Sequence, residues 1–222
     1  MSSQFRSKKT IIYEQLREEI VKGKYKPGER LVVDELATHM NASTIPIREA
    51  IQQLQADGFV TTQPHVGARI AEIDANFIYE VFALLESLEV ICSRSACTLM
   101  TDDELDQLEE MITVMDVYID KPTRWAEKNK EMHLFISECA KTTLVHKMIQ
   151  QTFDHWERLR RHYLANISSS RIPDAQQEHK LLLGAMQNRD SDEVERIIRQ
   201  HNQNALKSYI RHMQSEGHLL EQ

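Results

Sequence analysis

The chain has 222 residues, enough for one large domain or two small ones, and its 41% hydrophobic and 27% charged residues are ordinary for a globular protein. No apolar run reaches the ~18 residues that span a bilayer, and the N-terminal stretch lacks the apolar core of a secretion signal. A membrane protein is therefore excluded, and a cytoplasmic location is expected. The net charge of −7 argues against a nucleic-acid partner, but residues 1–72 carry +1, so an acidic protein can still have a basic DNA-binding face.

The first 73 residues mix helices with short extended segments. Apolar spacing, Gly and Pro turns and capping residues predict this order: helix 9–22, extended segment 31–33, a helix capped by Asp34, a helix from Ser43 or Thr44 to Asp57-Gly58, and strands 59–62 and 68–73. Two helices joined by a short turn and followed by a hairpin are typical of a winged helix-turn-helix.

Beyond Asp74 the pattern changes to long amphipathic helices with almost no strand signal. Six helices are predicted, over residues 76–98, 102–119, 123–140, 144–166, 174–188 and 191–214. A polar loop is expected from Ser168 to Pro173. The predicted fold is therefore mainly α: a winged helix-turn-helix domain over residues 1–73, followed by an all-α six-helix bundle over residues 74–222.

The start of the third helix carries groups that suit DNA. Hydroxyls and free backbone N–H groups at Ser43-Thr44 can meet phosphate. One turn on, Arg48 can bind guanine or phosphate in bidentate fashion, and Gln52 on the same face can read adenine. The alternative is that Arg48 pairs with a nearby glutamate, Glu49 or Glu35, and that Gln52 is only solvated.

Residues 20–31, 34–37 and 43–50 resemble the GntR superfamily, and the resemblance extends through the hairpin. It implies sequence-specific operator binding as a homodimer. The implied DNA-binding residues are Ser43, Thr44, Ile45, Pro46, Arg48, Gln52, His65 and Gly67. The chain departs from the family's usual Ser-Arg-Thr-Pro-Val-Arg, because Thr44 and Ile45 stand where Arg and Thr are usual. Asp34 also replaces an Arg that contacts DNA in some members, so no contact is assigned to it.

Four polar residues in the second domain have the spacing of a metal site. Asn129 and His133 lie at i and i+4 on one helix, so their side chains point the same way. His179 and His201 lie at nearly the same height on the last two helices, which a short turn makes antiparallel. Three His and an oxygen donor suit Zn²⁺, Ni²⁺ or a similar divalent cation. The spacing leaves open the alternative of three satisfied histidines in a polar core.

The same residues, with Glu178, resemble the FCD effector domain of FadR-branch GntR regulators, and the six helices resemble its VanR-type subgroup. The resemblance implies a divalent metal held by Asp and three His, with a small carboxylate effector completing the coordination. Asn129 replaces the usual Asp and is a weaker, neutral donor. Phe82 stands where many members have an Arg that holds the effector. The residues expected near the effector are Phe82, Arg94, His155 and Arg158, with Arg161 as a further substitute for that Arg; a solvated surface is the alternative for each arginine.

These features predict a ligand-responsive transcriptional regulator, a repressor or an activator, whose partners are double-stranded operator DNA, a small-molecule effector and a second copy of the chain, with no membrane. The competing hypotheses are a metal-dependent hydrolase built on the His cluster and a helical scaffold. No H-E-x-x-H signature is present, and Glu178 is the single candidate general base close to the cluster. The hydroxyl-and-Arg start of the third helix argues against the scaffold. We therefore expect a regulator and not an enzyme.

Overall fold

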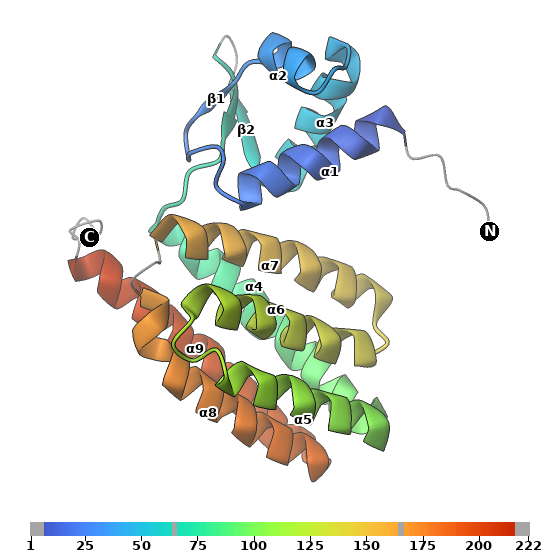
Figure 1. The fold of residues 1–222 in the computed structure, drawn as a ribbon, viewed down its shortest axis with the longest axis vertical. Helices are drawn as coiled ribbons and strands as arrows, with labels where there is room; N and C mark the ends of the chain where they lie inside the picture. Colours follow the sequence, from blue (N-terminus) through green and yellow to red (C-terminus); the bar gives the residue numbers. More distant parts are fainter. Residues whose placement is uncertain (1–6, 64–65, 164–166, 216–222) are drawn as a thin grey trace. The chain divides into compact units, whose positions relative to one another are not determined.

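A computed structural model describes residues 7–63, 66–163 and 167–215, and the chain divides into two compact units, residues 1–74 and 75–222 (Figure 1). The division falls one residue after the domain boundary expected from the sequence.

The N-terminal unit has the order of helices and strands that the sequence predicts. Its elements are α1 (Lys8–Val21), β1 (Arg30–Leu31), α2 (Val33–His39), α3 (Thr44–Ala56), β2 (Val60–Gln63) and β3 (Gly67–Ile70). The strands form an antiparallel sheet in the order β1-β3-β2, with Val60 opposite Ile70 and Gln63 opposite Gly67. The arrangement is a winged helix-turn-helix, in which the β2–β3 hairpin is the wing.

The buried face of α3 fixes how this helix sits in its unit. Ile47, Ala50 and Leu54 are fully buried at i, i+3 and i+7, and they pack in one core with Leu16 and Ile20 of α1. Because these positions share one side of the helix, the opposite side faces solvent. The core therefore holds α3 firmly and leaves its polar face available for binding.

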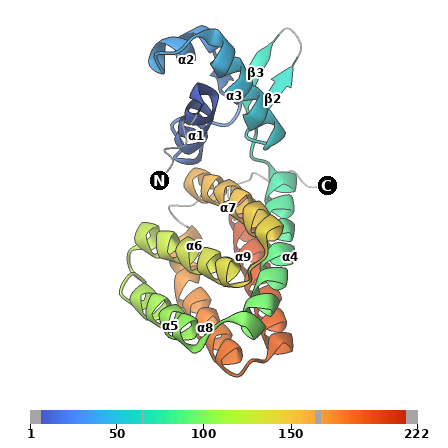
Figure 2. The ribbon, with the colours of Figure 1, turned by 90° about the vertical axis from the view of Figure 1, so that its right-hand side faces the viewer.

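The C-terminal unit contains, in the part of the chain that the structure describes, the six helices predicted from the sequence. They are α4 (Ala75–Leu99), α5 (Asp102–Asp116), α6 (Pro122–Cys139), α7 (Thr143–Tyr163), α8 (Ile167–Gln187) and α9 (Ser191–Ser215). Helix α4 packs against α6, α7 and α9, while α8 and α9 form an antiparallel hairpin (Figures 1 and 2). Helix α8 thus packs against both α9 and α6.

Two local predictions are wrong. Helix α2 begins at Val33 after the N-cap Val32, so Asp34 does not cap it; its carboxylate lies in the first turn, where the helix dipole favours a negative charge. The segment from Ser168 to Pro173 is helical, because α8 already begins at Ile167. Ile172 and Ala175 are buried at helical spacing around Pro173, so packing in the bundle outweighs the hydrogen bond that proline cannot donate.

Within the described residues, no helix combines the length and the apolar character needed to cross a membrane. The three cysteines, Cys92, Cys97 and Cys139, are free thiols and buried.

Candidate functional site

The exposed face of α3 presents the residues that the sequence assigns to DNA. Ser43 is the N-cap of the helix, and Ile45 in the first turn is 68% exposed. Arg48 and Gln52 are both exposed and lie at i and i+4, so they point to the same side. Thr44 and Pro46, also in the first turn, are half-buried.

The guanidinium of Arg48 lies on this face without an ion-pair partner among the described residues. Among the described residues, no carboxylate lies within ion-pairing distance of Arg48, so the expected alternative of pairing with Glu49 or Glu35 is not seen. Since Arg is the residue that most often makes bidentate contacts to guanine, an exposed and uncompensated Arg at this position fits a DNA-reading helix.

At the wing, Gly67 opens β3 with φ of 93°, a backbone conformation that glycine adopts without strain. Gly67 is exposed, and its partner in the register is Gln63. His65, the other expected wing contact, lies outside the described residues. Gly67 is therefore the expected wing contact that the described residues include.

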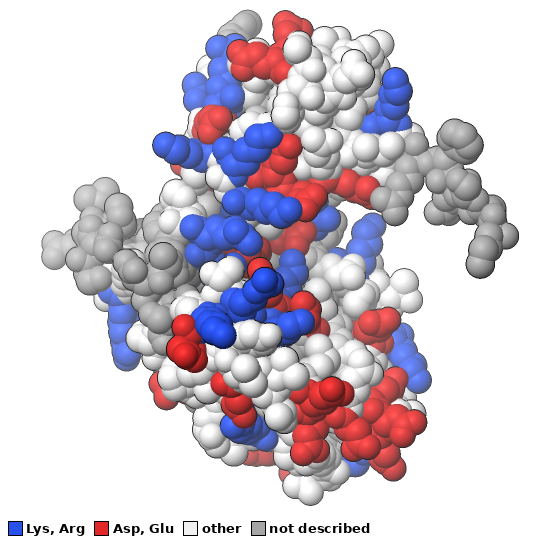
Figure 3. Space-filling view, viewed as in Figure 1, with Lys and Arg blue, Asp and Glu red and all other residues white. Residues whose placement is uncertain are grey.

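The charges are divided unevenly between the units. On the face drawn in Figure 3, lysine and arginine side chains gather on the sheet side of the N-terminal unit, while a dense acidic patch covers the α5 region of the C-terminal unit. Helix α5 carries three acidic residues in its first turn alone, Asp102, Asp103 and Glu104. The negative net charge thus belongs mainly to the unit that does not carry the helix-turn-helix.

In the C-terminal unit, three histidines from different helices converge. His133 of α6, His179 of α8 and His201 of α9 each offer one ring nitrogen, and these three nitrogens lie within 4.8 Å of one another. The ring centroids are 5.3 Å apart for His133–His179, 5.4 Å for His133–His201 and 4.9 Å for His179–His201. His133 and His179 are buried, and the His201 side chain is 12% exposed. The convergence predicted from the α8–α9 hairpin is therefore present.

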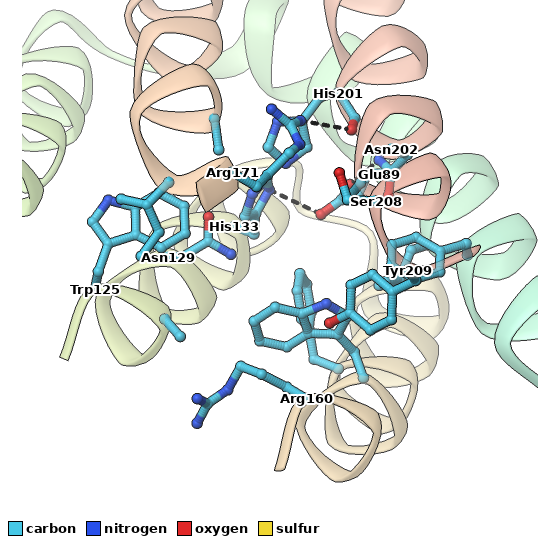
Figure 4. Close-up of a pocket in the computed structure, with 18 residues that line it drawn as sticks. Glu89, Trp125, Asn129, His133, Arg160, Arg171, His201, Asn202, Ser208 and Tyr209 are labelled. Carbon is cyan, nitrogen blue, oxygen red and sulfur yellow. Dashed lines mark hydrogen bonds and ion pairs between the residues drawn. The ribbon is translucent and has the colours of Figure 1, made fainter. Parts of the chain in front are cut away.

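Carboxylates orient two of these rings from behind. His133 Nδ1 donates to Glu89 Oε1 at 2.9 Å (Figure 4). His201 Nδ1 donates to Glu178 Oε2 at 2.7 Å. Because each Nδ1 is occupied by a carboxylate, each Nε2 is left with its lone pair for a ligand. A carboxylate on the far nitrogen is the usual second partner of a metal-binding histidine.

The other atoms of the cluster that could ligate a metal are buried and have no hydrogen-bond partner. Both ring nitrogens of His179 and Oδ1 of Asn129 are inaccessible and have no hydrogen-bond partner, although buried polar atoms nearly always have one. Burial, followed by the charges of His201 and His133, holds the pKa of His179 well below its ordinary range, so its ring is neutral, as a metal ligand must be. These residues fit a divalent cation held by three imidazoles and an amide oxygen.

The ionisation of Glu178 follows from its partners. Burial opposes the charged form, but hydrogen bonds from His201 and Arg171 lower the pKa of Glu178 to about 2. Glu178 is thus an ionised hydrogen-bond acceptor for His201, and its oxygens are engaged by His201, Arg171 and Asn204.

A cavity adjoins the cluster and has an accessible volume of about 70 Å³, room for several water-sized groups. Its walls combine aromatic and aliphatic side chains with cluster residues and two arginines: Phe82, Leu85, Glu89, Trp125, Ala126, Asn129, His133, Phe153, Trp156, Arg160, Arg171, Ile172, Ala175, His201, Asn202, Ala205, Ser208 and Tyr209. The two arginines differ in their partners: Glu157 binds two guanidinium nitrogens of Arg160, whereas Nε of Arg171 is buried without a partner. An apolar cavity with a few convergent polar groups is typical of a small-molecule site.

Of the residues expected near an effector, the structure brings one to this cavity. Phe82 lines it, whereas Arg94, His155 and Arg158 are not among the lining residues. Arg94 pairs with acidic residues of α9, and His155 and Arg158 both contact the ring of Phe77.

Sequence reasoning missed Glu89, Arg160 and Arg171. Glu89 and Arg160 carried a usable signal, because each is a charged residue in the buried stripe of an amphipathic helix. Arg171 could not be placed, since its segment was expected to be a loop.

Two family models match the chain: "Bacterial regulatory proteins, gntR family" over residues 8–70 and "FCD domain" over residues 80–204. The HTH-type transcriptional repressor RspR of Escherichia coli is 25% identical over 208 residues, which cover 93% of this chain and 90% of that protein. The repressor GlaR of the same organism is 24% identical over 197 residues, covering 85% and 90%. The solved structure of E. coli McbR/YncC has a TM-score of 0.75 at 20% identity, covering 93% of this chain and 99% of that one, and so shares its fold.

Proposed function

The chain belongs to the GntR family of bacterial regulatory proteins and carries an FCD domain, and from this premise we propose that a divalent metal and a small carboxylate in the C-terminal unit control its affinity for an operator. Members of this family are DNA-binding transcriptional regulators, so the chain is a regulator and not an enzyme. The observation that carries the proposal is the buried cluster of His133, His179 and His201 with unpartnered donors beside a cavity.

For DNA, the proposal assigns the reading of bases to Arg48 and Gln52, and the binding of phosphate to the first turn of α3. This is supported by the exposure of both side chains on one face and by the free guanidinium of Arg48. The exposed Ile45 offers an apolar surface of the kind that contacts the thymine methyl group. Gly67 places the wing backbone where it can approach the DNA without a side chain.

For the metal, the proposed ligands are the Nε2 atoms of His133 and His201, one ring nitrogen of His179 and Oδ1 of Asn129. Imidazole and amide donors suit Zn²⁺ or Ni²⁺, and fewer than six protein ligands leave open positions for an added ligand. When bound, the ion supplies a positively charged centre to which a carboxylate can coordinate. Arg171 offers a hydrogen-bond donor in the same cavity.

For the transmission of the signal, the proposed ligands lie on three helices, so binding stabilises one arrangement of α6, α8 and α9. A ligand shifts the DNA affinity only as far as it binds the DNA-competent and incompetent states differently, with ~1–3 kcal/mol of coupling as the typical range. We propose that a homodimer transmits this change, with α4 as a candidate seam: Leu84 and Ile91 are 48% and 49% exposed and lie two turns apart on one face.

The test is operator affinity as a function of metal. Fluorescence anisotropy with DNA from upstream of the protein's own gene is measured after dialysis against chelator, and again with Zn²⁺ or Ni²⁺ added. The wild type should change its affinity when metal is restored. The variant His179→Ala should not, whereas His162→Ala, which removes an exposed imidazole outside the cluster, should behave as the wild type. Equal metal responses in all three proteins contradict the proposed site; no binding to any DNA at low salt contradicts the proposed operator function.

A further inference from the structure

We propose that metal and carboxylate bind cooperatively to this protein, each raising the affinity for the other, because Asn129 leaves the ion without any anionic ligand from the protein. The inference rests on the proposed function of the histidine cluster and concerns how its two ligands depend on each other. It assigns a regulatory role to the amide at position 129: the site binds the carboxylate more tightly when the ion is present.

The donors that face the site are all neutral. Three imidazoles and one amide oxygen contribute no negative charge, and among the described residues the convergent group of metal-ligating side chains contains no carboxylate. A divalent ion placed there brings two positive charges into a region where Asn129, His133 and His179 are at least 95% buried. Burying uncompensated charge is strongly unfavourable, so the ion requires anions nearby.

The nearest protein anions compensate this charge only in part. Glu89 binds His133 with one oxygen and the amide of Asn202 with the other, so it acts from behind the ring. Glu178 is likewise engaged by His201 and is also paired with the cation of Arg171. With the ion bound, the two carboxylates and the one guanidinium leave the buried cluster with one net positive charge. One monoanionic carboxylate makes the cluster neutral.

The cavity shows where that carboxylate goes. Asn129, His133 and His201 line it, so an anion in the cavity reaches the open side of the ion (Figure 4). Arg171 lines the same cavity with a buried Nε–H that has no acceptor, which provides a second point of attachment. The chemical class of the ligand is therefore a small monocarboxylate with an apolar body that packs against the aromatic walls.

The dependence of metal binding on carboxylate binding can be measured by tryptophan fluorescence. The chain contains two tryptophans, Trp125 and Trp156, and both line the cavity, so intrinsic fluorescence reports occupancy without a label. Full-length protein freed of metal is titrated with Zn²⁺ in carboxylate-free buffer, and again with acetate, lactate or benzoate at millimolar concentration. These monocarboxylates chelate metal too weakly to compete with the protein. Calorimetry provides the same constants independently.

The informative variant is Asn129→Asp, which adds the missing negative charge at the ion. Asn188→Asp is the matched control, because it makes the same change of charge at an exposed residue between α8 and α9. In the wild type and the control, at least one carboxylate should raise the Zn²⁺ affinity by ~5–150-fold, and Zn²⁺ should raise the affinity for that carboxylate by the same factor. In Asn129→Asp, Zn²⁺ should bind tightly without carboxylate, and the enhancement should fall to less than about threefold.

The failures are distinguishable. Tight Zn²⁺ binding to the wild type that no carboxylate enhances overturns the cooperativity but leaves the metal site standing. An enhancement that is as large in Asn129→Asp as in the wild type overturns the role of Asn129. No Zn²⁺ binding to either protein, with or without carboxylate, overturns the metal site and with it this inference.

Discussion

Replacing His179 by leucine should stabilise the metal-free protein and at the same time abolish its stabilisation by metal. The ring of His179 is 1% exposed, and neither of its nitrogens has a hydrogen-bond partner. A buried donor or acceptor left without a partner costs about 1–3 kcal/mol. Leucine has a similar volume and no polar atom, so this penalty disappears in the variant.

The gain is reduced by one lost contact. The ring of His179 stacks on Trp125, with centroids 5.7 Å apart and planes 15° apart, and such pairs contribute about 0.5–1.5 kcal/mol. Taking about 2 kcal/mol for the relieved penalty and about 1 kcal/mol for the lost stacking, the net stabilisation expected for His179→Leu is about 1 kcal/mol, which raises the melting temperature by roughly 2–4 °C for a chain of this size. In the wild type, metal at about 100 times its Kd adds about 2.7 kcal/mol.

The assay is thermal unfolding followed by circular dichroism, with chelator and with excess Zn²⁺. The wild type should melt roughly 5–10 °C higher with Zn²⁺, and His179→Leu should melt at one temperature in both conditions. His162→Leu, at an exposed position, serves as the control and should follow the wild type. A metal-free His179→Leu variant that is less stable than the wild type by more than about 1 kcal/mol would show that His179 is a structural residue, and the argument from its unpartnered nitrogens would be refuted.

Two further predictions concern the DNA-binding helix and the thiols. Arg48→Ala should weaken operator binding by about 1–3 kcal/mol, or ~5–150-fold. The control is Arg124→Ala, which removes another exposed arginine, on α6, and should leave the anisotropy titration unchanged. Equal losses in both variants would mean that Arg48 contributes only general charge. Burial raises the pKa of Cys92, Cys97 and Cys139, the last to about 11, so all three thiols are protonated in the native state at pH 8. They should therefore react with a thiol-specific dye far more slowly than after unfolding. Native thiols that react as fast as those of the unfolded chain would contradict this prediction.

The parts of the fold that follow from periodicity were predictable. The stripe of Ile47, Ala50 and Leu54 defines the buried face of α3, and the same logic locates the six helices of the second unit. His179 and His201 could be paired because a short turn between two long helices makes them antiparallel, so equal distances from the turn mean equal heights.

The parts that depend on tertiary packing were not predictable. A serine-rich stretch before Pro173 has the composition of a loop, and only burial of Ile172 and Ala175 in the bundle makes it helical. Arg171 was therefore missed as a cavity residue. Arg94, which its charge placed near the effector, does not line the cavity, because it pairs with acidic side chains of α9 elsewhere. The exact start of α2 escaped prediction because Asp34 favours both a cap and a first turn.

We expect one ion to lie among three imidazoles and an amide oxygen and to receive its only anionic ligand from the effector. X-ray absorption at the metal edge tests this most directly, on protein loaded with Zn²⁺ or Ni²⁺ in carboxylate-free buffer and again with a monocarboxylate. We expect three imidazole ligands in both samples and a carboxylate oxygen only in the second. A protein carboxylate bound to the ion without added ligand, or fewer than three imidazoles, would contradict it.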